Sequence, residues 1–284
     1  MLIQEFSEYQ LSDSKPSTVK RYLNQINLFL LIYSPVKAQY SDLEEYFGEL
    51  AEQYSPQHLT VVKSSLIAYF NFLILQGERV DNPAKNIELK KVNRDVKHHL
   101  LLSTEELDML LEERKERYQA LKWRNKLLIS LVRYQGLTNA DLLQLTVDDI
   151  KGGELRIDAH SGMNGNTFKL EPIQIEYFYE WKSVRAEIAQ KGVTKLFLNK
   201  RGYDITGDGI TSVIDTLKPL FPEKRINNEV IRGSVIAEHL DKSKDVLASQ
   251  KFARHKWAST TMKYRNEMEG YSKVIQEKHP YNFM

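Results

Sequence analysis

The chain has 284 residues, of which 42% are hydrophobic and 10% aromatic, and it carries 40 lysines and arginines against 38 aspartates and glutamates. This composition excludes a disordered or collagen-like protein, and the length suffices for one large domain or two ordinary ones, each with its own core. The chain contains no cysteine, which excludes disulfides, thiol nucleophiles and cysteine-ligated metal centres.

Charge is distributed unevenly along the chain. Residues 1–96 hold 10 basic and 12 acidic side chains, whereas residues 97–284 hold 30 basic and 26 acidic ones. Seven basic residues and a single acidic one lie between Lys242 and Arg265. Charged runs are usually solvated, but the scarcity of acidic residues here favours a surface that faces phosphate groups.

No segment has the pattern of a signal peptide or a membrane span. Residues 1–10 contain two glutamates and no apolar core, and the longest apolar runs, residues 26–33 and 66–75, are short and interrupted. We therefore expect an intracellular, cytoplasmic protein that has no contact with a membrane.

Residues 1–80 are predicted to form a small helical bundle. In residues 17–30 apolar side chains recur every three or four positions, the period of a helix with one buried face. A short helix is expected at 42–50, and a longer one opens at Ser55-Pro56 and ends near Gly77.

Residues 81–97 are interpreted as a basic linker. They contain one proline, three asparagines and frequent charges without a stable period. A second domain, residues 98–284, then begins with a helix-capping pattern at 103–106, followed by a strongly apolar helix at 123–134.

The second domain is predicted to be mostly helical with a small antiparallel sheet. Residues 153–159 and 168–175 alternate between polar and apolar side chains, and residues 162–166 supply the turn of a hairpin. Helical patterns return at residues 176–189, 209–217, 228–240 and 245–254. The fold class is therefore mainly α (α+β).

Three stretches of this chain resemble the tyrosine recombinase (phage integrase) family. Residues 254–264, Arg-His-Lys-Trp-Ala-Ser-Thr-Thr-Met-Lys-Tyr, resemble the family's Gly-His followed by Thr-Thr-x-x-Tyr, with Arg254 in place of the glycine. Residues 131–145 resemble its Gly-Leu-Arg-x-x-Glu-Leu-x-x-Leu box, and residues 82–84 and 102–107 resemble its usual domain junction. The resemblance implies an N-terminal helical core-binding domain of the SAM-like type and a catalytic-type domain.

The resemblance also implies roles for individual residues. In such enzymes a tyrosine attacks a DNA phosphate and forms a 3'-phosphotyrosyl link, while arginines and a histidine hold the phosphoryl oxygens. Tyr264 matches the nucleophile, although a tyrosine kept only for packing is about equally compatible with the sequence. His255 matches the late histidine and Arg232 the second arginine.

Two positions of the expected site carry the wrong chemistry. Thr138 stands where the first arginine is expected, and its context favours a helix cap. Glu229 stands where a histidine is expected. The resemblance also implies a hairpin lysine that protonates the departing hydroxyl, and the sequence leaves its identity open. Lys169 is the candidate, but it lies later in the chain than the usual position, which falls near Asn164.

Loss of one preorganised donor typically costs about 10²- to 10³-fold in rate, so two losses predict a site disabled for cleavage. Arg133 or Arg225 could compensate for the missing arginine. The residues expected to contact DNA share a basic or polar side chain in the matching segments; they are Lys20, Arg21, His58, Thr60, Lys63, Ser64, Lys90, Lys91, Arg94, Lys251, Arg254 and Lys256.

The first hypothesis is a sequence-specific double-stranded DNA-binding protein that has lost cleavage and regulates transcription, such as an integrase-like prophage repressor of the SPbeta type. The alternatives are an active divergent recombinase that uses Tyr264, and a non-cutting partner of an active relative. No cofactor or metal is expected. Residues 267–284 are apolar enough to dock on a second copy on DNA or on their own domain.

Overall fold

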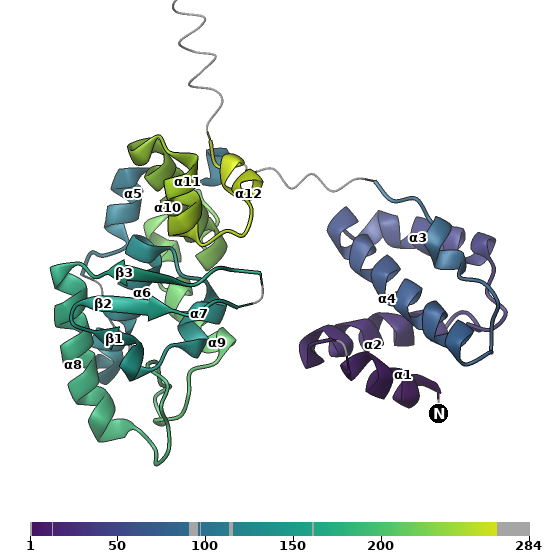
Figure 1. Ribbon diagram of the computed structural model, residues 1–284, viewed down its shortest axis with the longest axis horizontal. Helices are drawn as coiled ribbons and strands as arrows, with labels where there is room; N and C mark the ends of the chain where they lie inside the picture. The colour runs from purple at the N-terminus through teal and green to yellow at the C-terminus, as the bar shows by residue number, and fades with distance from the viewer. Residues whose placement is uncertain are drawn as a thin grey trace, which may run out of the picture. The chain divides into compact units, whose positions relative to one another are not determined.

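The computed structural model consists of two compact units, residues 1–94 and 95–284 (Figure 1). It describes residues 2–12, 14–90, 96, 98–113, 116–160 and 162–265. Both units are mainly helical, and the sheet found in the described part of the chain has three short strands. The predicted fold class, mainly α with a small antiparallel sheet, is confirmed.

The N-terminal unit is built from α1 (Leu2–Leu11), α2 (Pro16–Leu30), α3 (Tyr40–Gln53) and α4 (Pro56–Leu75). Helix α1 was not predicted from the sequence; its Phe6 packs edge-on against Tyr69 and Phe72 of α4. By length and composition α4 could cross a membrane. Its apolar character is accounted for by packing, because eight of its residues are buried in the core of the unit.

Part of the predicted linker belongs to the N-terminal unit. The short 3-10 helix η1 (Pro83–Asn86) carries Pro83 and Ala84 into the core. Asn82 donates from Nδ2 to the carbonyl of Ile67 at 3.0 Å and to Oδ1 of Asn71 at 2.8 Å. The polar composition of residues 82–87 therefore reflects caps and turns and not a free linker.

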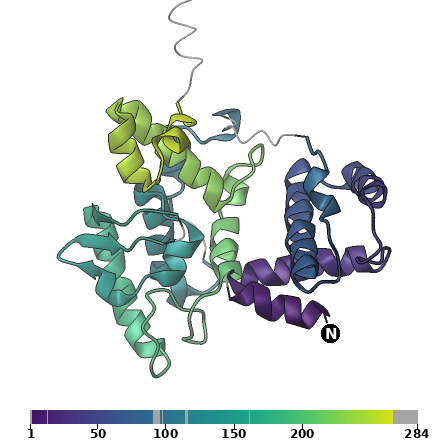
Figure 2. The same cartoon turned by 45° about the vertical axis from the view of Figure 1, so that its right-hand side comes forward.

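The second unit contains one extended core around α6 (Lys122–Gln135), which packs against α8 (Pro172–Ile188) and α10 (Asn228–Ser243). The other elements are η2 (His98–Leu100), α5 (Thr104–Met109), η3 (Gln119–Leu121), α7 (Asn139–Gln144), η4 (Val147–Asp149), α9 (Gly207–Asp215), η5 (Lys218–Leu220), α11 (Val246–Ala253) and α12 (Ala258–Met262). Figure 2 shows the C-terminal helices α10 to α12, in light green and yellow, gathered at one end of this unit.

The sheet has the order β1 (Ile150–Lys151), β2 (Glu154–Ile157) and β3 (Asn166–Lys169), all antiparallel. The predicted hairpin is β2–β3. Its second strand ends at Lys169 and does not run on to residue 175, because Pro172 occupies the first turn of α8, where proline favours a helix start. The two-residue strand β1 was too short to predict.

The connection between β2 and β3 reaches the end of α11. Met163 forms an isolated antiparallel bridge with His255, and the amide of Asn164 donates to the carbonyl of Arg254 at 2.9 Å. Residues that are about 90 positions apart in the sequence are thereby held side by side.

Candidate functional site

Three of the residues implied by the resemblance lie together at the meeting point of α10, α11 and α12. The rings of His255 and Tyr264 are stacked, with centroids 6.0 Å apart and planes 20° apart. A Cβ atom on Gly233 would lie 3.3 Å from the Cε1 atom of Tyr264, so the phenol packs against α10 directly beside Arg232. Helix α10 therefore places Arg232 and the phenol in one group.

The phenol of Tyr264 is poorly prepared to ionise. Burial raises the pKa of Tyr264, Arg232 opposes this with its positive charge, and the nearby carboxylate of Glu229 raises the pKa again. The net direction is upward. Glu229 is exposed on the first turn of α10, so its carboxylate adds negative charge where the resemblance predicts a histidine.

Arg232 is fixed by two backbone carbonyls. Its Nη1 donates to the carbonyl of Gly136, at the end of α6, and its Nη2 donates to the carbonyl of Ala253, at the end of α11, at 2.5 Å. Burial, followed by the charge of Arg254, lowers the pKa of Arg232 to about 10. The guanidinium therefore stays charged at neutral pH and links three elements.

His255 is buried and neutral. Its Nδ1 lies 2.9 Å from the hydroxyl of Thr261, and its carbonyl accepts from the side chains of Asn164 and Gln250, each at 3.2 Å. Burial, followed by the charges of Arg232 and Arg254, lowers the pKa of His255 to about 4. At pH 7 the neutral imidazole can donate a hydrogen bond to a phosphate but adds no positive charge.

Thr138 is the N-cap of α7, as its sequence context indicated. Its amide and its hydroxyl both donate to Oδ2 of Asp141 at 2.7 Å, and the amide of Asp141 donates back to the hydroxyl at 3.2 Å. This reciprocal arrangement satisfies the first turn of the helix. No cation reaches the group from position 138.

Arg254 is buried, whereas the charge pattern favoured an exposed position. Its side chain is 0% exposed and forms an ion pair with the equally buried Asp141. Oδ1 of Asp141 also lies 2.5 Å from Nε2 of His160. Burial raises the pKa of Asp141, but hydrogen bonds from His160, Thr138 and Arg254 lower it by more. The net pKa is below the ordinary value, so the carboxylate is charged at neutral pH.

The structure does not bring Lys169 into this group. In β3 it is exposed and pairs in register with Glu154, at the end of the ladder opposite the hairpin tip. The tip residue beside His255 is Asn164. Arg133, one of the two possible substitutes for the missing arginine, is bound to Glu238 at 2.7 Å and Asp108 at 2.8 Å.

Two of the remaining predicted DNA contacts in the second unit, Lys251 and Lys256, are exposed at the same end of the unit. In the N-terminal unit, Lys20 and Arg21 are exposed on α2. Lys91 and Arg94 lie outside the described residues, as does the apolar segment 267–284.

The predicted contacts on α4 are half-buried and already bonded within the unit. Lys63 donates to the carbonyl of Ile87 at 2.6 Å, and the hydroxyls of Thr60 and Ser64 donate to carbonyls one turn earlier. His58 stacks on Tyr54, with ring centroids 4.5 Å apart. Lys63 is the only lysine or arginine of this set, and its ammonium group is bound to a backbone carbonyl of the same unit.

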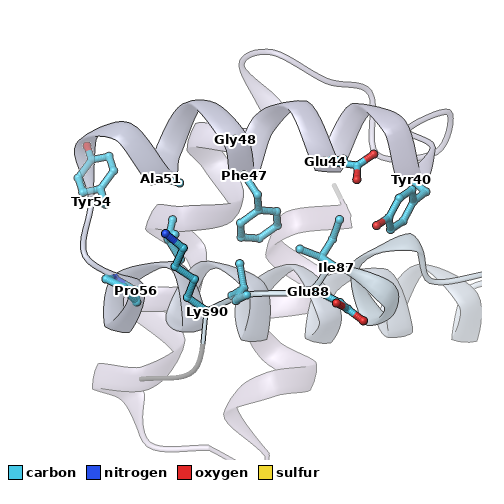
Figure 3. A pocket seen from close by; sticks show the side chains of 12 residues that line it. Tyr40, Glu44, Phe47, Gly48, Ala51, Tyr54, Pro56, Ile87, Glu88 and Lys90 are labelled. Atoms are coloured by element: carbon cyan, nitrogen blue, oxygen red, sulfur yellow. The ribbon is translucent and has the colours of Figure 1, made fainter. Parts of the chain in front are cut away.

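Lys90 borders a cavity of about 490 Å³ between α3 and the start of α4 (Figure 3). Figure 3 shows Phe47 and Ile87 in its wall and Glu88 at its rim. Among the residues that line this cavity, Lys90 is the only basic one, and Glu44 and Glu88 are acidic.

Sequence reasoning missed the part that Asp141 plays. The acidic residue was recognised only as part of a helix cap, whereas in the structure it joins α7, the hairpin and the end of α11 through Thr138, His160 and Arg254. Two features of the sequence could have indicated this ion pair: an acidic residue, Asp141, in the box at 131–145, and an arginine in place of the family's glycine at position 254.

Known proteins resemble this chain in sequence and in fold. The sequence model of the phage integrase family matches residues 101–270. Tyrosine recombinase XerC of Vibrio campbellii is 27% identical over 221 residues, which cover 76% of this chain and 69% of that protein. A second XerC, of Vibrio atlanticus, is 26% identical over 221 residues, covering 76% and 70%.

Two solved structures show the same fold. A XerH site-specific recombinase, in a post-cleavage complex with a palindromic difH substrate, has a TM-score of 0.73 at 18% identity, covering 99% of this chain and 95% of that one. A lambda integrase dimer bound to a COC' core site has a TM-score of 0.71 at 14% identity, covering 94% and 77%. The family match spans more than half of the chain and includes Thr138, Arg232, His255 and Tyr264; this protein belongs to the phage integrase family of tyrosine recombinases.

Proposed function

We propose that this protein binds specific sites on double-stranded DNA without cleaving them and acts in the cytoplasm as a transcriptional regulator, for example as a prophage repressor. The observation that carries the proposal is the environment of Tyr264. Burial and the carboxylate of Glu229 both raise the pKa of the phenol that would have to attack a phosphate.

The described residues of the hairpin tip, 158–160 and 162–165, also include no lysine to protonate a leaving group. Strand cleavage releases a 5'-hydroxyl, which needs a proton from a positioned acid. The hairpin-tip residue beside His255 is Asn164, whose amide donates hydrogen bonds but does not release a proton at neutral pH. Lys169 lies at the far end of the ladder.

The charge balance of the group suits binding better than catalysis. Two guanidiniums, Arg232 and Arg254, stand against two carboxylates, Asp141 and Glu229, and His255 is neutral at pH 7. A phosphoryl transition state gathers more negative charge than the ground state and needs an excess of preorganised cations. A ground-state phosphate needs less, and outer cations such as Lys251 and Lys256 add affinity for the backbone.

The proposal is tested by capturing fragmented DNA from the source genome on the purified protein. One half of each sample is washed in native buffer and the other in denaturant, and the retained DNA is sequenced. We expect discrete sites after the native wash and none after the denaturing wash. DNA that survives denaturant with the wild-type chain, but not with Tyr264→Phe, would refute the loss of cleavage; absence of discrete sites after the native wash would refute specific binding.

A second function, an active divergent recombinase, is favoured by the stacking of Tyr264 on His255 beside Arg232. It predicts a covalent DNA adduct that depends on the Tyr264 hydroxyl. The denaturing wash of the same experiment detects that adduct.

A further inference from the structure

Arg254 occupies a backbone conformation that arginine rarely adopts. At the end of α11 it has φ 58° and ψ 26°, in the left-handed region, where helices usually place a glycine. A residue with a Cβ atom is strained there. Strained residues of this kind concentrate at functional sites, where the surrounding structure holds them in place.

The side chain of Arg254 is unusually short of partners. It is 0% exposed, and only its Nη2 is engaged, by Asp141. Among the described residues, neither its Nε nor its Nη1 has a hydrogen-bond partner. Buried polar groups are almost always bonded, so two free donors on one buried guanidinium indicate a partner that the described residues do not supply.

The guanidinium of Arg254 lies near Thr138, where the expected arginine is missing, and near Arg232 and His255 of the candidate site. Its partner Asp141 accepts from both the amide and the hydroxyl of Thr138, so the charge sits next to the position where the expected arginine is missing. The charge of Arg254 also lowers the pKa of both Arg232 and His255, which places it within electrostatic reach of each.

We propose that Arg254 is the second cation of a DNA phosphate-binding site, supplied from the end of α11 in place of the arginine missing at Thr138, and that its two unpaired nitrogens donate hydrogen bonds to a backbone phosphate. This inference rests on the proposed binding of DNA but not on the loss of cleavage. Because Arg254 is fully covered, a side chain that covers it must move before a phosphate reaches it.

The test removes the arginine at position 254 and introduces an arginine at position 138. The affinity of the full chain for a fluorescently labelled mixed-sequence DNA duplex is measured between about 50 and about 200 mM salt, for the wild type, Arg254→Gly and the double variant Arg254→Gly with Thr138→Arg. Glycine relieves the strain at position 254, and Asp141 keeps its donors Thr138 and His160. Arg201→Ala, in the turn between α8 and α9, is the matched control.

One phosphate contact contributes about 0.9 to the slope of log affinity against log salt. We expect Arg254→Gly to lower the slope by about that amount, the double variant to restore it, and Arg201→Ala to leave it unchanged. An arginine that only supports the fold would lower the melting temperature without changing the slope, and Thr138→Arg would restore nothing; either result overturns the inference.

If Arg254→Gly alone does not fold, the variant Arg254→Gly with Asp141→Asn removes both buried charges and is measured in its place, with the same expected loss of slope. A wild-type chain that does not bind the duplex at all would refute the inference, whereas the proposed function is refuted by the absence of discrete sites after the native wash. Denaturant-resistant DNA would refute only the loss of cleavage.

Discussion

The imidazole of His255 and the phenol of Tyr264 are stacked with their centroids 6.0 Å apart, and both rings belong to a group in which the histidine is neutral at physiological pH. Electrostatic stabilisation of a phosphate in this group therefore depends on guanidiniums alone. Burial of His255 beside Arg232 and Arg254 lowers its pKa and so ties the stability of the fold to the protonation of the imidazole.

The stability of the second unit is expected to fall with acidification below about pH 6.5. Since burial and two guanidiniums lower the pKa of His255 to about 4, the unfolded chain binds a proton at this residue more readily than the folded one between those values. Stability from this residue is present above pH 6.5 and is lost as the pH falls toward 4, by an amount on the order of 3 kcal/mol.

This pH dependence is measured by urea unfolding of the wild type and of His255→Asn from pH 7.5 to pH 4.5. Burial also lowers the pKa of His239, so part of the slope remains in the variant. Equal slopes in the two proteins would contradict the assignment to His255.

Substitution of Asp141 by alanine is expected to destabilise the second unit by about 3–5 kcal/mol. The change leaves the guanidinium of Arg254 buried without its counterion, which costs far more than the lost helix cap. Asp149 provides a matched control, because it caps η4 through Thr146 with the same geometry but has no buried arginine. Asp149→Ala should cost about 1 kcal/mol in the same denaturation experiment.

Glu229→Gln is expected to tighten DNA binding roughly two- to fivefold, the effect of removing one repulsive surface charge. The carboxylate lies close enough to Tyr264 to raise the pKa of the phenol, and a phosphate at this group would feel the same field. Fluorescence anisotropy at low salt measures the change. Glu180→Gln, an equally exposed substitution on α8, should have no effect; an equal gain there would indicate a mere change of net charge.

Lys251 and Lys256 are expected to contribute affinity without sequence preference. Their joint substitution by glutamine should lower the slope of log affinity against log salt by about 1.8, since each phosphate contact contributes about 0.9. The ratio of affinities for captured and mixed-sequence DNA should stay the same. A change in that ratio with an unchanged slope would show that these lysines read bases and not phosphates.

The sequence by itself determined the fold class and most of the helices, and the resemblance named the members of the candidate site. Helices α2, α4 and α6 have apolar residues at the spacing of a buried face, and Thr138 lies in a capping pattern that is local in the chain. Arg232, His255 and Tyr264 were assigned by resemblance, and the structure brings them together. The inferences about the helices and the cap succeeded because the interactions they depend on lie within a few residues of the chain.

Only the tertiary structure decided what the charged residues do. Arg254 was expected on the surface because it lies in a run of cations, but the left-handed end of α11 turns it inward to Asp141, 113 residues earlier in the chain. Lys169 was left open because the position of a hairpin side chain depends on register, and the pairing with Glu154 places it away from the tip. Burial and ion pairing across distant segments are set by packing, which local sequence patterns do not encode.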